Sequence, residues 1–235
     1  RTSGEVAVLD ELGRILGMEK APEIIEAYDI SNTAGSENVA SMIVFTDGRP
    51  DKSQYRKFKI KSVSGPDDYA SMREVLSRRL KHLDDENGSF SEFPDLILLD
   101  GGRGHVATAR GLLQEMDLDL PVFGMVKDDF HKTRALCTEN EEISIARVQD
   151  VFTLIYRIQE EVHRYTIGRM TQAKRKTVRT SSLTKIPGIG DAKAKKLLAA
   201  FGGLAALKKA TCEQIAAVPG ISAKDADNIV AYFRK

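Results

Sequence analysis

The chain has 235 residues, of which 42% are hydrophobic, and this is enough apolar material for one large domain and one small one. This composition excludes a disordered chain, and the lack of any run of about 18 apolar residues predicts that no segment crosses a membrane. The net charge of +1 excludes a chain that is strongly basic throughout.

The first part of the chain is predicted to form a helix and three antiparallel strands. The helix keeps apolar residues at helical spacing and is closed by Gly17. The dipeptide Asp47-Gly48 lies between two strand patterns and predicts a hairpin. The helix is expected at 5–17 and the strands at 24–31, 39–46 and 55–60, with a polar turn at 32–38.

The middle of the chain alternates helical patterns with short apolar strands. Continuous apolar runs such as 96–99 are typical of strands that are buried on both faces. Helices between such strands indicate an α/β sheet with parallel central strands. Helices are expected at 67–81, 105–116 and 148–170, strands at 94–100, 121–126, 135–137 and 143–145, and a polar loop at 84–93.

The end of the chain has a different composition. Residues 164–235 hold 15 Lys and Arg against 4 Asp and Glu, while the preceding 163 residues hold 20 against 30. Such an asymmetry is typical of a chain that binds nucleic acid through one part, and a solvated lysine-rich surface is the alternative interpretation. We predict a first domain at 1–170, a basic linker at 171–182 that runs near a DNA backbone through Lys174, Arg175 and Lys176, and a second domain at 183–235.

The predicted second domain contains an internal repeat. The unit Pro-Gly-Ile-(Gly/Ser) occurs at Pro187 and again 32 residues later at Pro219. Each copy places a glycine turn before a helix, whose free N–H groups favour an anion such as a phosphate. The expected DNA contacts are Gly188, Gly190, Lys193, Gly220, Ser222 and Lys224.

This repeat resembles the tandem helix-hairpin-helix family of sequence-independent DNA binders. The second copy has Ser222 where the first has Gly190, so we expect the first hairpin to bind DNA better. A plain turn between two packing helices is the alternative interpretation.

Two aspartates end predicted strands of the first domain. Asp29 ends the first strand, and Asp100 ends the buried one. Sites of α/β sheets form at the carboxyl ends of strands, and carboxylates there suit Mg²⁺ or Mn²⁺. Such an ion supports phosphodiester cleavage. His163 lies at the border of the apolar face of the long helix, where a plain surface or core histidine is the alternative.

Four segments in this order resemble the C-terminal half of the UvrC family, the nuclease subunits of bacterial UvrABC excision systems. They are AYDISN (27–32), SGPDDYASM (64–72), LILLDGGRGHV (96–106) and RIQEEVHRYTIGRM (157–170). The resemblance implies an RNase H-like mixed sheet with flanking helices, followed by a small all-α tandem helix-hairpin-helix domain. It also implies a divalent-metal-dependent endonuclease that makes the 5′ incision beside a lesion in nucleotide excision repair.

The resemblance also implies a catalytic set. Asp29, Asp100 and His163 match the family's Asp-Asp-His set and its metal ligands, and Asp68 matches a further aspartate. Whether His163 binds the metal or positions a water as a base stays open. A role at a helix start is the alternative for Asp68.

Other residues near these motifs have two interpretations. A tight turn beside the metal is expected at Gly101 and Gly102, although an ordinary strand-to-helix turn explains them nearly as well. Arg103 and His105 are expected to meet the substrate phosphate, whereas a solvated charge explains each of the following better: Lys127, Arg134 and Arg164.

Cellular location and partners follow from the cysteines and from the family. Cys137 and Cys212 fit no zinc or redox spacing, which predicts reduced thiols in a cytoplasmic protein. Because the first residue is Arg1 and no secretory leader is visible, we expect a piece of a longer protein. The expected partners are double-stranded DNA and, through segments mostly absent here, UvrB and the UvrA-loaded complex.

Two other functions remain open at this point. One is a non-catalytic DNA-binding adaptor whose first domain is only a scaffold. The other is a different RNase H-like enzyme, such as a repair nuclease of the endonuclease V kind or a resolvase.

Overall fold

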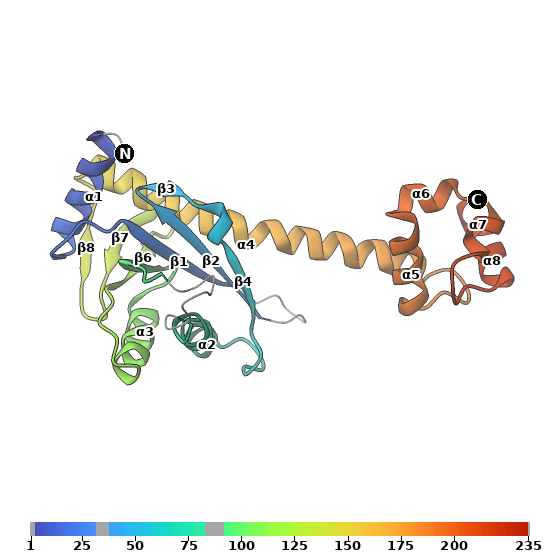
Figure 1. Cartoon of the computed structure of the whole chain (residues 1–235), viewed down its shortest axis with the longest axis horizontal. Coiled ribbons are helices and arrows are strands. Elements are labelled where there is room, and N and C mark those ends of the chain that lie inside the picture. The colour runs from blue at the N-terminus through green and yellow to red at the C-terminus, as the bar shows by residue number, and fades with distance from the viewer. Residues whose placement is uncertain (1–2, 32–37, 83–91, 235) are drawn as a thin grey trace. The chain divides into compact units, whose positions relative to one another are not determined.

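A computed structural model describes residues 3–31, 38–82 and 92–234 of the chain, with side chains 169–181 left out (Figure 1). The chain divides into two compact units, Arg1–Ile167 and Gly168–Lys235. Of the helices in the described ranges, none is long and apolar enough to cross a membrane.

The first unit is built on one mixed sheet in the order β3-β2-β1-β5-β6-β7-β8, with β4 paired to β2. β1 pairs antiparallel with β2 and parallel with β5, and β5 pairs parallel with β6. The expected parallel centre with antiparallel flanks is therefore confirmed. The strands are β1 Ile24–Ser31, β2 Val39–Thr46, β3 Arg49–Pro50, β4 Arg56–Lys59, β5 Leu96–Leu99, β6 Val122–Lys127, β7 Thr133–Cys137 and β8 Glu142–Ser144.

Helices cover both faces of this sheet. The apolar sides of α2 (Asp68–Leu80) and α3 (Arg103–Glu115) pack on one face, and those of α1 (Ser3–Ile15) and α4 (Gln149–Leu183) pack on the other. All four residues of β5 are buried, because this strand contributes apolar side chains to both cores. The arrangement places the carboxyl ends of β1 and β5 side by side.

The hairpin after β2 differs from the expected one. Asp47 and Gly48 have φ angles of 53° and 81°, as a two-residue hairpin turn requires, but the turn leads into the short strand β3. The short helix η1 (Lys52–Gln54) follows, and only then does β4 return to β2. Most of the expected turn at 32–38 and loop at 84–93 lies outside the described residues.

The predicted end of the long helix at Met170 is wrong. α4 continues to Leu183 and includes the whole segment 171–182 that was expected to be a linker. The sequence contains neither Gly nor Pro between 169 and 183, so nothing there breaks a helix. The apolar periodicity therefore ends at Met170 although the helix continues to Leu183.

The second unit is all helical, as expected. α5 (Asp191–Phe201), α6 (Leu204–Lys209), α7 (Cys212–Ala216) and α8 (Ala223–Phe233) surround their own apolar core. Two short helices, α6 and α7, lie between α5 and the second copy of the repeat. A capping box at Thr211 starts the second of them, since its hydroxyl accepts a hydrogen bond from the Gln214 N–H.

Candidate functional site

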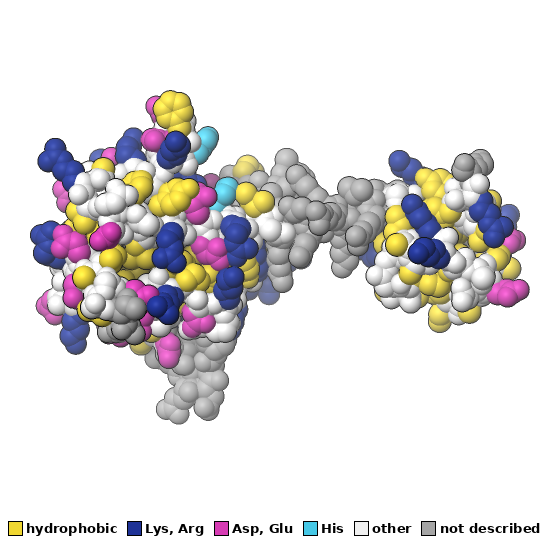
Figure 2. All heavy atoms as spheres, turned by 90° about the horizontal axis from the view of Figure 1, so that it is seen from above, with side chains coloured by type: hydrophobic (Ala, Val, Ile, Leu, Met, Phe, Trp, Pro, Cys, Tyr) yellow, Lys and Arg dark blue, Asp and Glu magenta, His cyan; other side chains and the backbone are white. Residues whose placement is uncertain are grey.

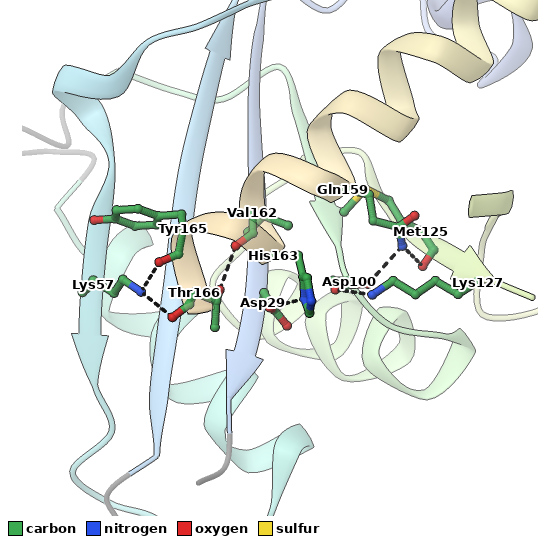
Figure 3. Close-up of polar contacts among 10 residues, drawn as sticks. All are labelled: Asp29, Lys57, Asp100, Met125, Lys127, Gln159, Val162, His163, Tyr165 and Thr166. Atoms are coloured by element: carbon green, nitrogen blue, oxygen red, sulfur yellow. Dashed lines mark hydrogen bonds and ion pairs between the residues drawn. The ribbon is translucent and has the colours of Figure 1, made fainter. Parts of the chain in front are cut away.

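Three side chains from three elements meet at the carboxyl ends of the central strands (Figure 3). Asp29 belongs to β1, Asp100 follows β5, and His163 is on α4. β1 and β5 pair so that Tyr28 lies opposite Leu99, and the Asp100 N–H donates to the Tyr28 carbonyl at 2.8 Å. One ligand atom from each of the three side chains lies within 4.8 Å of the other two.

Asp29 is a buried carboxylate in a mixed electrostatic environment. Burial, and then the charge of Asp100, raise its pKa to about 7. The nearby Thr166 side chain and the charges of Lys127 and Lys57 lower this pKa. Without a bound cation, burial and repulsion from Asp100 thus outweigh the groups that favour the charged form.

Asp100 is held at both carboxylate oxygens. Its Oδ2 pairs with the Lys127 ammonium at 3.0 Å, and its Oδ1 accepts a hydrogen bond from the Gln159 amide at 3.1 Å. Gln159 is 1% exposed, donates to the Met125 carbonyl at 3.3 Å and accepts from the Thr133 hydroxyl. The carboxylate therefore has a fixed orientation.

His163 is the most accessible member of the set. Its Nδ1 lies 4.0 Å from Asp29 Oδ2, and half of its side chain is exposed. Two residues further along α4, the Tyr165 carbonyl accepts a hydrogen bond from Lys57 of β4 at 2.8 Å, and the Lys57 ammonium lies over the Tyr165 ring. Lys57 thus holds this part of α4 against the sheet.

The donor set fits a divalent cation. Carboxylate oxygens are preferred ligands of Mg²⁺ and Mn²⁺, and a half-exposed imidazole adds a third donor or a base next to them. Among the described residues, Asp29, Asp100 and His163 form a group of carboxylate and imidazole side chains that is close enough together to hold a metal ion.

Asp68 is not a member of this group. It is the first residue of α2, but the cap is its neighbour Asp67, whose Oδ1 accepts from the Ala70 N–H at 3.0 Å. Asp68 lies near His105, since its charge and that of Asp100 raise the pKa of His105, while burial lowers this pKa more strongly. A catalytic role for Asp68 stays a prediction.

Of the two glycines after Asp100, only Gly101 is needed for space, and neither is needed for a positive φ. Neither Gly101 nor Gly102 has a positive φ. A Cβ on Gly101 would lie 2.5 Å from the His105 ring, whereas one on Gly102 would meet nothing within 4 Å. His105 therefore packs directly against the backbone beside the carboxylate pair.

The cations that the sequence analysis considered have different surroundings. Lys127 is not a solvated charge but the partner of Asp100. Arg134 pairs with Glu142 and Arg164 pairs with Glu161, each on an exposed surface. Arg103 is exposed at the start of α3.

The hairpins of the second unit contact each other through residues 32 positions apart. Gly188 and Gly220 both have a φ of 86°. Lys193 donates to the Gly188 carbonyl at 3.2 Å and pairs with Asp225 at 2.8 Å. Asp225 occupies the position in the second copy that Lys193 occupies in the first. The charge of Lys193 is thus partly offset, which leaves less of it for a phosphate.

The N-cap residues just before α5 and α8 differ between the two copies of the repeat. Ser222 accepts from the Asp225 N–H and caps α8, whereas Gly190 precedes α5 without a side-chain cap. Lys195, Lys196 and Lys224 are exposed, and Figure 2 shows Lys and Arg side chains spread over one face of this unit. The side chains of Lys174, Arg175 and Lys176 lie outside the described residues.

The polar residues that support the carboxylates are not among those predicted from the sequence. Gln159 lies four positions after Ile155 and three before Val162, on the buried face of α4. A polar residue in an apolar stripe is a signal of a buried hydrogen-bond network. Nothing comparable in the sequence distinguishes Thr133, Thr166 or Lys57.

Comparisons with known proteins agree for both units. Residues 13–167 match a family model described as the UvrC RNAse H endonuclease domain. Residues 180–235 match one described as a SAM-like helix-hairpin-helix tandem.

Curated relatives are longer than this chain. The chain is 46% identical to UvrABC system protein C of Clostridium acetobutylicum over 97% of its length, and 44% identical to the protein of that name from Clostridioides difficile over 98%. It spans 38% and 37% of these two relatives.

Solved structures give weaker matches. Human ENDOV is 12% identical, with 69% of this chain and 90% of that chain covered and a TM-score of 0.42. Ciona intestinalis Endonuclease V in complex with DNA is 17% identical, with 46% and 48% covered and a TM-score of 0.32.

Proposed function

We propose, from the premise that this chain belongs to the family of UvrC RNase H endonuclease domains, that it cuts DNA in bacterial nucleotide excision repair and makes the 5′ incision beside the lesion. The observation that carries the proposal is the convergence of Asp29, Asp100 and His163 at one sheet edge. A scaffold alone has no need for two adjacent carboxylates, one of which is buried at a cost in free energy.

The chemistry follows from the donor set. A divalent ion, Mg²⁺ or Mn²⁺, would be held by Asp29 and Asp100 and would supply Lewis acidity toward the phosphodiester. Gln159 and Lys127 orient Asp100, so the ligand geometry is set before substrate arrives. The half-exposed His163 can complete the ligand set or accept a proton from the attacking water.

The second unit would hold the DNA. Its two glycine turns present backbone N–H groups at helix starts, and the exposed lysines around them favour phosphates without reading bases. The first hairpin has Lys193, Lys195 and Lys196 after its turn, while the second has acidic residues at the equivalent positions of the first two. We therefore expect stronger binding by the first hairpin.

Lesion choice would depend on parts beyond this chain. The curated relatives bear the name of a component of the UvrABC system, and this chain spans 38% of their length. We expect UvrB, delivered by a UvrA-loaded complex, to direct the cut. The chain alone should bind DNA and cut weakly, without preference for a lesion; robust lesion-selective incision by it would contradict this view.

The test compares Asp100→Asn with wild type in the full-length protein, reconstituted with its partners on a lesion-containing duplex in Mg²⁺ and in Mn²⁺. The amide keeps the shape of the side chain but removes its charge. Loss of 5′ incision, with 3′ incision and DNA binding retained, supports the proposal. Asp119→Asn, an exposed aspartate after α3, is the matched control and should cut normally. Unchanged 5′ incision by Asp100→Asn would favour the adaptor.

A further inference from the structure

An exposed aromatic side chain lies beside the metal site. Tyr69 is the second residue of α2, directly after Asp68, and it is 50% exposed. Its ring centroid lies 4.8 Å from that of His105, which is in the first turn of α3. The two rings meet at a tilt of 53°, so they support each other without a parallel stack.

Each of the two rings packs closely against the backbone of a glycine. A Cβ on Gly104 would lie 2.5 Å from the Tyr69 hydroxyl oxygen, and one on Gly101 would lie 2.5 Å from His105 Nδ1. Neither glycine has a positive φ, so close approach rather than backbone conformation explains them. Tyr69 is therefore fixed in position although half of its surface faces solvent.

The pair borders the carboxylates. Gly101, which supports His105, directly follows Asp100. His105 is close enough to Asp100 and Asp68 for both charges to act on its ring. Tyr69 is in turn anchored through α2, since the buried ion pair of Arg79 with Glu26 joins this helix to β1 at 2.6 Å. An exposed ring thus has a defined place near the carboxylate pair.

We propose that Tyr69, supported by His105, stacks on a nucleobase of the cleaved strand next to the scissile phosphate. The inference rests on the proposed function, because it assumes that a DNA phosphate lies at the Asp29–Asp100 cluster. A base is joined to that phosphate through one sugar, so it extends to the border of the cluster. An aromatic face accepts any base, which suits a nuclease that must cut at any sequence.

The test separates base contacts from backbone contacts. The whole chain, in an Asp100→Asn background that prevents cutting, binds two fluorescent single-stranded oligonucleotides of equal length in Mg²⁺. One carries bases and the other is abasic. The measured quantity is the affinity for the strand with bases divided by the affinity for the abasic strand. The interactions of the hairpins with the DNA backbone cancel in this ratio.

Tyr69→Ala should lower this ratio about 5- to 150-fold, as the loss of one stacked base predicts. Tyr69→Phe keeps the ring and should stay within about twofold of the parent chain. The control is Phe93→Ala, because Phe93 is 49% exposed but precedes β5, at the opposite end of the strand from Asp100. An unchanged ratio for Tyr69→Ala, or an equal drop for Phe93→Ala, would overturn the inference.

A second measurement needs no variant of Tyr69. An oligonucleotide with 5-iodouracil is irradiated on the chain with native Tyr69, and the attached peptide is identified. Attachment at Tyr69 or His105 supports the stack, and attachment only in the second unit contradicts it. The two proposals can be contradicted separately. If the wild-type protein with its partners makes no incision, the proposed nuclease function is wrong. If only the affinity ratio is unchanged by Tyr69→Ala, the proposed base stacking alone is wrong.

Discussion

At the scale of single residues, the raised pKa of Asp29 makes folding stability depend on pH. Its carboxyl keeps a proton up to a pKa of about 7 in the folded chain, but loses it near 3.8 when unfolded. The unfolded state thus binds fewer protons between these values, and folding stability falls as pH rises from about 4 to 7. The loss is complete above the folded pKa.

Asp29→Asn removes this titration. In EDTA at pH 8, we expect the substituted chain to be more stable than wild type by up to about 4 kcal/mol, with the difference disappearing near pH 4. Urea unfolding over this pH range measures it, with Asp119→Asn as the control. A gain that is independent of pH would show that relief of the buried charge is not its cause.

Gln159 is the residue that the site depends on without contacting the substrate. Gln159→Leu fills the same buried space but removes the donor to Asp100 Oδ1, and leaves the Thr133 hydroxyl without its acceptor. We expect about 10- to 100-fold weaker Mn²⁺ binding, the range for losing a partner of a ligand. Titration followed by electron paramagnetic resonance measures this. The exposed Gln149 on the same helix provides the control, Gln149→Leu, which should bind Mn²⁺ normally.

At the scale of elements, the two hairpin turns look equivalent but have different neighbours. Alanine at Gly188 or Gly220 costs about 1–2 kcal/mol, because both have a φ of 86°. At Gly188 the new Cβ would also lie 2.8 Å from the Asp225 carboxylate, which Lys193 and the Ser222 N–H hold in place. At Gly220 it would meet only the end of the Lys196 side chain, at 3.1 Å.

Gly188→Ala should therefore cost about 1–3 kcal/mol more than Gly220→Ala. Hydrogen exchange of α5 and α8 in the whole chain would show the difference as faster exchange in the first variant. Equal exchange in the two variants would mean that Asp225 moves aside freely, and that its link between the hairpins is weak.

Local sequence patterns predict some features of these elements but not all contacts between side chains that are distant in the sequence. The apolar run of β5 and the turn at Asp47-Gly48 are local signals, and both predictions are confirmed. The proximity of Asp29 and Asp100 could be predicted from the sequence, because neighbouring parallel strands end at the same side of a sheet. The ion pair of Lys127 with Asp100 could not, since a lysine at a strand end has the same local pattern whether it is solvated or paired.

At the scale of the whole molecule, positive charge is concentrated near the C-terminal end of the chain and negative charge in the rest. The basic end of the chain, 164–235, has 15 Lys and Arg against 4 acidic residues, whereas the rest is acidic. Because the carboxylates of a metal site repel DNA, we expect the basic unit to supply most of the attraction. Binding of duplex DNA by this chain should accordingly weaken with salt, as phosphate binding requires.

The double substitution Lys195→Ala/Lys196→Ala tests where this attraction arises. Both lysines are exposed on α5, behind the first glycine turn. If each lysine neutralises one phosphate, the slope of log affinity against log salt should fall in magnitude by about 0.9 for each phosphate that is no longer neutralised. Fluorescence anisotropy with a duplex at several salt concentrations measures the slope. The control is Lys20→Ala, an exposed lysine before β1 at the sheet edge away from Asp29, which should keep the wild-type slope. If both variants reduced it equally, the acidic unit would share in binding the DNA, and the division of charge along the chain would not reflect a division of function.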